Sequence, residues 1–312
     1  MNEQELLLEW YERCGRKELP WRNLMGDQAS YGVYVSEVML QQTRVSAVLE
    51  YFDAFMRAYP TLHSLSLASQ DAVLLLWQGL GYYSRAKNLL KTARMTGTKL
   101  PSDLDSLLAL PGIGDYTARA ILCFGFGQAV GFYDTNIKRF FCRYFALTAP
   151  SHKTLHRIAQ DFLNLKNPFD HNQALLDLGA LVCLPKNPHC KICPLHLTCK
   201  GRHHPSLYSA GKKVMYTPLT LHLGVYEEGG CVAMFRDQKW NGLYSFPEIL
   251  PESGRWIGEV KHTRTHYKIT AKIYRLYSLP KQAGIELLED RERFPMSSLS
   301  RKILEKLKQC PS

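Results

Sequence analysis

Four cysteines within one short segment constrain this chain more than any other feature. Cys183, Cys190, Cys193 and Cys199 follow the spacing C-x6-C-x2-C-x5-C, which places four thiols within 17 residues. Glycine and proline residues in the same segment favour tight turns, so the sulfurs can converge. Four buried small hydrophobic residues would not be expected at this density. The segment is therefore predicted to hold one metal centre.

The spacing also bears on which metal is bound. Four thiolates fit either a [4Fe–4S] cluster or a structural zinc ion. Zinc sites usually combine two short C-x-x-C pairs, whereas here only Cys190 and Cys193 form a short pair. Nine cysteines without a secretory signal indicate a reducing compartment, where clustered thiols bind metal. We therefore favour iron–sulfur over zinc, and both over a disulfide pair.

Length and charge limit the class of protein. A chain of 312 residues can form one large or two ordinary domains with a substantial core. A net charge of +11 favours a polyanionic partner, with nucleic acid first and an acidic membrane surface second. The N-terminal MNEQELLLEWYERC is predicted to form an acidic amphipathic helix rather than a signal peptide, and no apolar run reaches the length of a membrane span. We expect a cytoplasmic, non-secreted protein without a membrane partner; a merely basic soluble protein is the alternative.

The hydrophobic pattern changes once along the chain. Up to about residue 200, apolar residues recur every three or four positions in segments that include Tyr31–Leu49, Asp71–Gln78, Ser84–Met95, Leu104–Leu110, Asp115–Phe124 and Asn136–Ala146. A polar, basic stretch, GRHHPSLYSAGKK, follows Cys199 and is typical of a linker.

Beyond this stretch the pattern predicts strands. Residues alternate in Leu219–Val225, Cys231–Phe235, Gly258–Arg264 and Lys268–Tyr277, and a short helix is predicted at Leu299–Gln309. We therefore predict a multi-domain protein. Its parts are an all-α domain over residues 1–205 that carries the cysteines, a linker over 206–216, and a smaller α+β domain over 217–312.

A glycine-containing turn between two predicted helices is a candidate phosphate contact. Leu107–Gly114 has the sequence LLALPGIG. Gly112 and Gly114 let backbone N–H groups at the start of the second helix approach a phosphate, and the helix dipole adds attraction. Such a hairpin binds the DNA backbone without distinguishing sequence. Glycine required only by the geometry of the turn is the alternative.

Two carboxylates are candidates for catalysis. Glu37 lies among apolar neighbours in YVSEVMLQQTR, so it must be paired, protonated or functional. Its simpler role is that of a partner for Arg44. Asp134, in YDTNIKRF, lies at a predicted helix start and would by default be an N-cap. With the hairpin, the two acids suggest cleavage of a glycosidic bond in nucleic acid, one protonating the leaving group and the other stabilising an oxocarbenium ion.

Several motifs in order resemble a known family. SEVMLQQT, GLGYYSRAKNL, LPGIGDYTARAIL, DTNIKR and the four-cysteine segment resemble the helix-hairpin-helix DNA glycosylases, and more narrowly the MutY-type adenine DNA glycosylases, over about residues 19–200. The resemblance implies an enzyme of base-excision repair, monomeric on double-stranded DNA, with a [4Fe–4S] cluster. Such an enzyme flips out adenine mispaired with 8-oxoguanine or guanine and hydrolyses its N-glycosidic bond, which is unreachable within the stack.

The resemblance also implies roles for the acids and their neighbours. Glu37 matches the acid that protonates adenine, and apolar neighbours would raise its pKa. Asp134 matches the carboxylate that stabilises the cationic sugar, with or without a covalent intermediate. Asn136 and Tyr116 match residues that position these acids. The related endonuclease III has a Schiff-base lysine at the position of Tyr116, so strand cleavage is not expected here.

Five further residues match DNA or base contacts of the family. Gln42 and Tyr82 match residues inserted beside the mispair, Trp21 and Arg22 match part of the adenine pocket, and Lys138 matches a residue near the DNA backbone. The alternatives are helix-surface polarity for Gln42, core packing for Tyr82, a structural turn for Trp21 and Arg22, and a solvated lysine for Lys138.

The cysteine segment is expected to act on DNA through its loop rather than by redox chemistry. The resemblance implies that the cluster folds the Lys186–His189 loop against DNA. Lys186, Lys191 and Lys200 would add positive charge there.

The C-terminal part resembles the Nudix-like module with which MutY-type enzymes detect 8-oxoguanine. Gly242–Glu248, GLYSFPE, matches the family stretch GLWEFP, and the absence of a Nudix box argues against pyrophosphate hydrolysis. The family's lesion-reading H-x-F-S-H is His262-Thr263-Arg264-Thr265-His266 here, which makes Arg264, Thr265 and His266 the candidate contacts. Thr265 keeps a hydroxyl, but Arg264 replaces an aromatic ring with a phosphate-seeking guanidinium. An ordinary basic strand face is the alternative.

Two other functions fit parts of the pattern. One is a glycosylase of the same superfamily that removes thymine from T·G pairs, against which Glu37 and the appended domain argue. The other is a non-catalytic mismatch-binding protein, against which the presence of both Glu37 and Asp134 argues.

Overall fold

The computed structural model describes residues 2–208, 215–289 and 293–309 and divides the chain into two compact units. The first is Met1–Leu67 with Lys91–Lys212, and the second is Ala68–Leu90 with Lys213–Ser312. The segment Ala68–Leu90 thus groups with the C-terminal strands, although its helical pattern resembles that of the first unit. The domain bounds expected from the sequence stay a prediction, and part of the expected linker, residues 209–214, lies outside the described residues.

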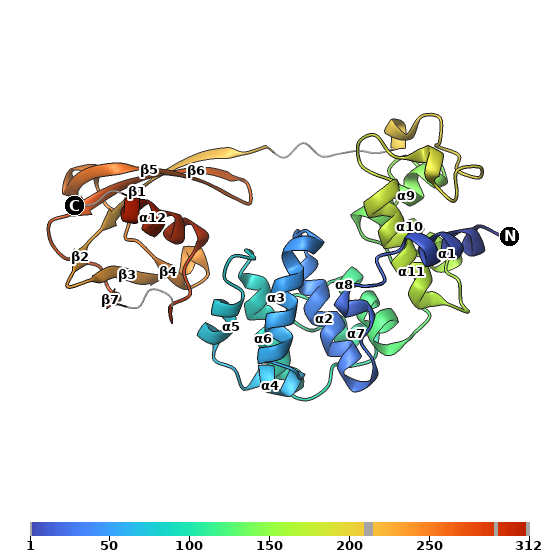
Figure 1. The fold of residues 1–312 in the computed structure, drawn as a ribbon, viewed down its shortest axis with the longest axis horizontal. Helices are drawn as coiled ribbons and strands as arrows, with labels where there is room; N and C mark the ends of the chain where they lie inside the picture. The colour runs from blue at the N-terminus through green and yellow to red at the C-terminus, as the bar shows by residue number, and fades with distance from the viewer. Residues whose placement is uncertain (1, 209–214, 290–292, 310–312) are drawn as a thin grey trace. The chain divides into compact units, whose positions relative to one another are not determined.

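The described part of the first unit is helical (Figure 1). Its α-helices are α1 (Glu3–Cys14), α2 (Ala29–Leu40), α3 (Val45–Ala58), α4 (Leu62–Ser66), α7 (Leu104–Leu108), α8 (Asp115–Ala120), α9 (Thr135–Tyr144), α10 (His152–Asp161) and α11 (Pro168–Asp177). Two π-helical turns, η3 (Ile121–Gly125) and η4 (Leu178–Val182), extend α8 and α11. Short 3₁₀ turns are η1 (Pro20–Arg22), η2 (Gly26–Gln28), η5 (Cys190–Ile192) and η6 (Pro205–Tyr208). In the second unit, α5 spans Gln70–Leu76, while α6 (Ser84–Thr96) crosses the division.

Helix α2 lies in the interior of the first unit. Every residue from Ala29 to Met39 is buried, as expected for a helix that is apolar on all sides. An apolar cluster joins α1 to α9, α10 and α11, so the N-terminal helix packs against the helices that precede the cysteine segment. These two packings fix the helices that carry the acidic residues.

One predicted helix is wrong in its extent. The pattern over Tyr31–Leu49 predicted one helix, but α2 ends at Leu40 and α3 begins at Val45. Gln42 between them has a φ of 56°, in the left-handed region that ends a right-handed helix. Because apolar residues continue with helical spacing on both sides, the periodicity alone hides the break. The helix predicted at Asp115–Phe124 likewise changes to a π-helical turn after Ala120.

The second unit contains two sheets and a C-terminal helix. Its elements are β1 (Thr217–Val225), β2 (Glu227–Glu228), β3 (Cys231–Asp237), η7 (Gln238–Trp240), β4 (Leu243–Ser245), η8 (Pro251–Ser253), β5 (Gly254–Arg264), β6 (Tyr267–Leu276), β7 (Ile285–Leu288) and α12 (Ser298–Gln309). In one sheet, β6 pairs in parallel with β1 and antiparallel with β5. In the other, β3 pairs with β2, β4 and β7, all antiparallel.

Both sheets and α12 share one core, which includes Leu223, Met234, Ile273 and Ile303. The four strands predicted from alternation and the predicted C-terminal helix are confirmed, with ends that differ by at most four residues. Strands β2, β4 and β7 were not predicted, because two to four residues are too few to show a period.

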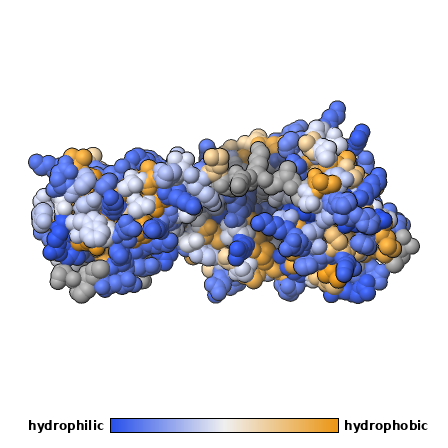
Figure 2. Space-filling view, turned by 90° about the horizontal axis from the view of Figure 1, so that it is seen from above, coloured by the Kyte–Doolittle hydropathy of each residue, from blue (hydrophilic) through white to orange (hydrophobic). Residues whose placement is uncertain are grey.

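The described helices include none that is both long and apolar enough to cross a membrane. On the face drawn in Figure 2, hydrophilic side chains dominate and hydrophobic ones are scattered among them. Scattered apolar side chains of this kind are normal on a protein surface.

Candidate active site

One pocket of the first unit brings together seven of the residues singled out in the sequence. Its lining includes Trp21, Arg22, Glu37, Gln42, Tyr116, Asp134 and Asn136. They come from η1, α2, the α2–α3 connection, α8 and the start of α9. Residues far apart in the chain therefore meet at one site, and two of them are carboxylic acids.

Glu37 is buried at this pocket because it lies on the interior helix α2. Its exposed fraction is 6%. Burial raises the pKa of Glu37 to about 7, and the nearby Asp134 charge adds to this, whereas a hydrogen bond from Tyr116 and the charge of Arg22 oppose it. A carboxyl group with this pKa is protonated in a large fraction of molecules near neutral pH, so it can donate a proton.

Asp134 is held by the start of α9. Its Oδ1 accepts hydrogen bonds from the backbone N–H groups of Asn136 at 2.9 Å and Ile137 at 2.7 Å, and its Oδ2 accepts one from the Asn136 side chain at 2.8 Å. Burial raises the pKa of Asp134, while these three hydrogen bonds lower it. Asp134 is thus an N-cap, as its position predicted, and it also lines the pocket. A fixed carboxylate at this place can stabilise a positive charge on a bound ligand.

Tyr116 connects the hairpin to the acids. Its hydroxyl hydrogen-bonds Glu37, and its ring packs edge-on against Phe132 with centroids 5.5 Å apart. Burial and the charges of Glu37 and Asp134 raise the pKa of Tyr116, so the phenol stays protonated. Tyr116 can therefore orient Glu37 but cannot act as an amine nucleophile.

Arg22 and Trp21 form one wall of the pocket. The guanidinium of Arg22 makes two hydrogen bonds of 2.8 Å to the two carboxylate oxygens of Asp177, and Arg16 binds the same carboxylate. Although burial alone would raise it, these partners hold the pKa of Asp177 below its usual value. Trp21 packs edge-on against Phe52. Arg22 and Trp21 therefore have structural contacts with Asp177 and Phe52, and both also line the pocket.

A hydrogen-bonded chain joins Asp134 to the cysteine segment. The Asn136 side chain, which donates to Asp134, accepts a hydrogen bond from Arg139 Nη2 at 3.1 Å. Arg139 also donates to the carbonyl oxygens of Gly179 at 2.6 Å and Cys183 at 2.8 Å. A Cβ atom at Gly179 would lie 2.8 Å from Asn136 Cβ, so only glycine allows η4 to approach α9 this closely. The orientation of Asn136, and with it of Asp134, depends on where the cysteine segment begins.

Two residues that line the pocket, and the buried aspartate that binds its arginines, were missed by the sequence analysis. Gln173 on α11 lines the pocket and is 4% exposed, Arg16 also lines it, and Asp177 anchors both arginines. Asp177 stands in the apolar run ALLDLGALV, so the argument applied to Glu37 would have found it. Gln173 carried no comparable signal, because a glutamine in a helix is ordinary.

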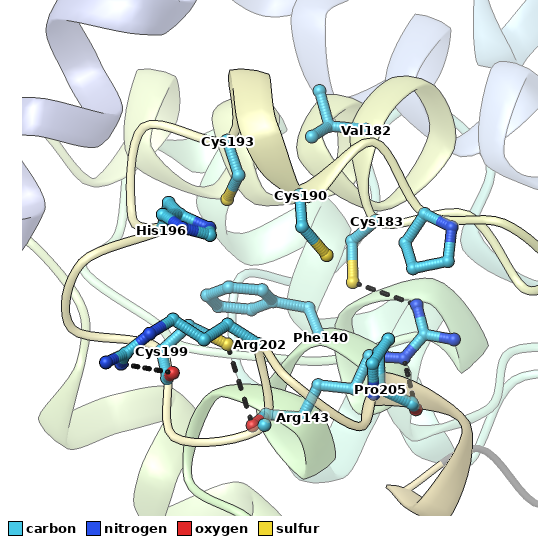
Figure 3. A pocket seen from close by; sticks show the side chains of 12 residues that line it. Phe140, Arg143, Val182, Cys183, Cys190, Cys193, His196, Cys199, Arg202 and Pro205 are labelled. Atoms are coloured by element: carbon cyan, nitrogen blue, oxygen red, sulfur yellow. Dashed lines mark hydrogen bonds between the residues drawn. The ribbon is translucent and has the colours of Figure 1, made fainter.

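The four cysteines line a second pocket. Cys183, Cys190, Cys193 and Cys199 face it together with the Phe140 ring, and all four are free thiols (Figure 3). Arg143 holds the first part of the segment: its Nη1 donates to Cys183 Sγ at 3.3 Å and to the carbonyl of Leu184 at 2.7 Å. Among the described residues, no three or more His, Cys, Asp or Glu side chains are arranged to hold one metal ion.

The remaining predicted contacts lie outside the acidic pocket. Gly112 is exposed with a φ of 76°, which glycine adopts freely, and Gly114 is the exposed N-cap of α8. Lys138 is exposed on α9. In the second unit, Tyr82 is 41% exposed with a φ of 49°, which does not fit the core-packing alternative. Arg264, Thr265 and His266 lie at the β5–β6 turn of that unit.

Comparison with known proteins identifies the family of the chain. Residues 35–165 match the family model of the HhH-GPD superfamily base excision DNA repair proteins. An adenine DNA glycosylase of Buchnera aphidicola subsp. Baizongia pistaciae is 35% identical over 264 residues, which cover 80% of this chain and 74% of that protein. The human adenine DNA glycosylase is 42% identical over 211 residues, or 63% of this chain and 38% of that protein, so the match spans less than half of the human enzyme.

Solved structures show the same fold. A thermostable thymine-DNA glycosylase aligns with a TM-score of 0.60 at 25% identity, over 64% of this chain and 94% of that one. Endonuclease III in complex with DNA aligns with a TM-score of 0.54 at 20% identity, over 65% and 98%. The family model and the curated relatives therefore identify a base-excision repair glycosylase of the helix-hairpin-helix superfamily. Within this superfamily, the chain belongs to the MutY-type adenine DNA glycosylases.

The raised pKa of Glu37 predicts that this residue destabilises the fold at neutral and higher pH. Because the folded state holds the proton up to about pH 7, the free energy of unfolding falls as pH rises from about 4.5 to 7. We expect Glu37→Gln to raise that free energy by about 2–3 kcal/mol at pH 8 and by less than about 1 kcal/mol at pH 5. Urea denaturation at the two pH values measures this.

The exposed Glu50 on α3 offers a matched control. Glu50→Gln should change the free energy of unfolding by less than about 0.5 kcal/mol at both pH values. An equal effect of the two substitutions at pH 8 would show that burial does not raise the pKa of Glu37.

Proposed function

We propose that this chain hydrolyses the N-glycosidic bond of adenine mispaired with 8-oxoguanine or guanine in double-stranded DNA, as a monofunctional enzyme of base-excision repair. The observation that carries the proposal is the pair of acids in one pocket, in which Glu37 is buried with a pKa of about 7 and the partly buried Asp134 is fixed by three hydrogen bonds. Membership of the adenine DNA glycosylases supports the choice of base.

The proposed reaction divides the work between the two acids. Protonated Glu37 transfers its proton to a ring nitrogen of the flipped adenine, so the electron pair of the breaking glycosidic bond can leave with a neutral base. Asp134 stabilises the positive charge that develops on the sugar. Water then adds to the sugar carbon and loses a proton, leaving adenine and an abasic site.

Features of the pocket support a reaction that stops at base removal. No lysine lines the pocket within the described part of the chain, and Tyr116 occupies the hairpin position next to Glu37. Schiff-base formation requires an amine, which a phenol cannot replace. We therefore propose little or no strand cleavage.

The surface supports DNA as the partner. The net charge is +11, and exposed Gly112 and Gly114 leave backbone N–H groups of the hairpin accessible to phosphate. Gln42 and Tyr82 adopt left-handed backbone conformations, which are unfavourable for residues other than glycine. Backbone strain of this kind is often found at binding sites. We propose that both side chains insert beside the mispair, and that the enzyme acts as a monomer on DNA in the cytoplasm.

Single-turnover base release tests the proposed function. With duplexes that carry A opposite 8-oxoguanine, A opposite G, A opposite T and T opposite G, we expect fast adenine release from the first and slower release from the second. No release is expected from the other two. Thymine release from T·G would instead favour the chemistry named for the structural relative, and tight binding without release would favour a mismatch-binding protein.

We also propose that the four cysteines hold a [4Fe–4S] cluster. The donor set is four thiols on one pocket, which suits iron–sulfur ligation. Each thiolate of such a cluster binds a different iron, so the sulfurs need to surround one space rather than meet at one point. Lys186, Lys191 and Lys200 are exposed on the same segment and would face the DNA backbone.

Metal analysis of the purified chain tests the cluster. We expect four irons and four sulfides per chain, with a yellow-brown colour, and we expect Cys199→Ser to lower the iron content. Cys14→Ser is the matched control, because Cys14 is exposed on α1 and does not line the pocket. One zinc per chain in a colourless, fully active preparation would contradict the proposal.

A further inference from the structure

The β5–β6 turn holds an uncommon backbone conformation at its tip. Arg264 ends β5 and pairs with Tyr267, the first residue of β6. Thr265, which follows Arg264, has a φ of 50° and is exposed. A β-branched residue rarely adopts this conformation unless its surroundings enforce it. The contacts that hold Arg264 therefore determine where Thr265 points.

The end of the β5–β6 hairpin packs against the side chain of Trp240. The guanidinium carbon of Arg264 lies 4.3 Å from the centroid of the Trp240 ring, and Arg264 Nη2 donates to the carbonyl of Lys239 at 2.5 Å. The His262 ring, two residues earlier and thus on the same face of β5, lies 6.1 Å from the Trp240 ring. One indole contacts two alternate residues of the strand that leads into Thr265.

The position of Trp240 is itself fixed by a closed turn. Asp237 Oδ1 accepts a hydrogen bond from the Lys239 backbone N–H at 2.8 Å, and the Gly242 backbone N–H donates to the Asp237 carbonyl at 2.8 Å. Asn241, directly after Trp240, has a φ of 59° and lets the chain turn into β4. The indole is therefore presented from a short, hydrogen-bonded segment between two paired strands.

These contacts change what Arg264 is expected to do. The sequence suggested a phosphate-seeking guanidinium in place of the aromatic ring usual for the family. In the structure, that guanidinium is half-buried against an aromatic ring and a carbonyl oxygen. Trp240, from another part of the chain, supplies the aromatic surface, and the cation–π contact joins the two residues.

Trp240, His262, Arg264 and Thr265 line one pocket of the second unit. An aromatic face beside hydroxyl and imidazole groups suits a flat base with polar edges. We infer that Trp240 is a positioning residue for lesion selectivity, which holds Arg264 so that Thr265 meets the 8-oxoguanine opposite the adenine. This inference rests on the proposed function, and it adds Trp240 to the residues on which that function depends.

The test is the ratio of single-turnover rates for A opposite 8-oxoguanine and A opposite G. We expect Trp240→Ala and Arg264→Ala each to lower the first rate about tenfold and the second less than about twofold. The double variant should be no worse than either single one, because the two residues act as a unit. Trp240→Phe should retain most of the selectivity, since a smaller ring still offers a face to Arg264.

Trp256→Ala is the matched control. Trp256 is 60% exposed near the start of β5 and does not line this pocket, so its loss should leave both rates unchanged. If Trp240→Ala does not fold, as thermal unfolding would show, Arg264→Ala carries the same test. Equal loss of both rates in folded Trp240→Ala and Arg264→Ala, or no loss in either, would overturn the inference.

Measurements of DNA binding distinguish an error in this inference from an error in the proposed function. Duplexes with 8-oxoguanine or guanine opposite a non-cleavable adenine analogue report recognition without chemistry. We expect the wild-type chain to prefer the 8-oxoguanine duplex, and Trp240→Ala to lose that preference. A wild-type chain that keeps this binding preference but releases no adenine would contradict the proposed function alone, whereas an unchanged preference in Trp240→Ala would overturn the role of Trp240.

Discussion

The burial of the Glu37 carboxyl group is the constraint on which the rest of the site depends. An acid on the interior helix α2 keeps its proton near neutral pH only because apolar neighbours exclude water and Asp134 stands nearby. The same burial destabilises the fold once the proton is lost. Tyr116 hydrogen-bonds the acid, and Arg22 opposes the rise of its pKa. The site therefore balances an acid strong enough to protonate a base against an interior that disfavours its charge.

Asp134 depends on a longer chain of contacts than Glu37 does. Its orientation comes from the N-terminus of α9 and from Asn136, which Arg139 holds against the carbonyls of Gly179 and Cys183. Arg143, one turn further along α9, donates a hydrogen bond to the Sγ atom of the same Cys183. A disturbance of the cysteine segment thus reaches the carboxylate through two side chains. This gives the segment a structural reason to matter for catalysis without any redox step.

Much of the fold and of the candidate site could be predicted from the sequence, because the informative residues break a local pattern. Glu37 was conspicuous as an acid among apolar residues, and the cysteine spacing and the glycines of the hairpin were equally visible. The break at Gln42 was not, because a left-handed residue leaves the apolar period unchanged on both sides. The contact of Trp240 with Arg264 could not be predicted either, since it joins η7 to the end of β5 through tertiary packing. Gln173 reaches the pocket only through the position of α11.

The pH dependence of adenine release in a single turnover tests the central role of Glu37 most directly. If protonated Glu37 is the general acid, the rate constant should be level below about pH 7 and fall about tenfold per unit above it. Glu37→Gln should lower the rate at pH 6 by at least about 100-fold and remove the dependence. A wild-type rate that stays level to pH 9, or a Glu37→Gln rate near that of the wild type, would contradict the account.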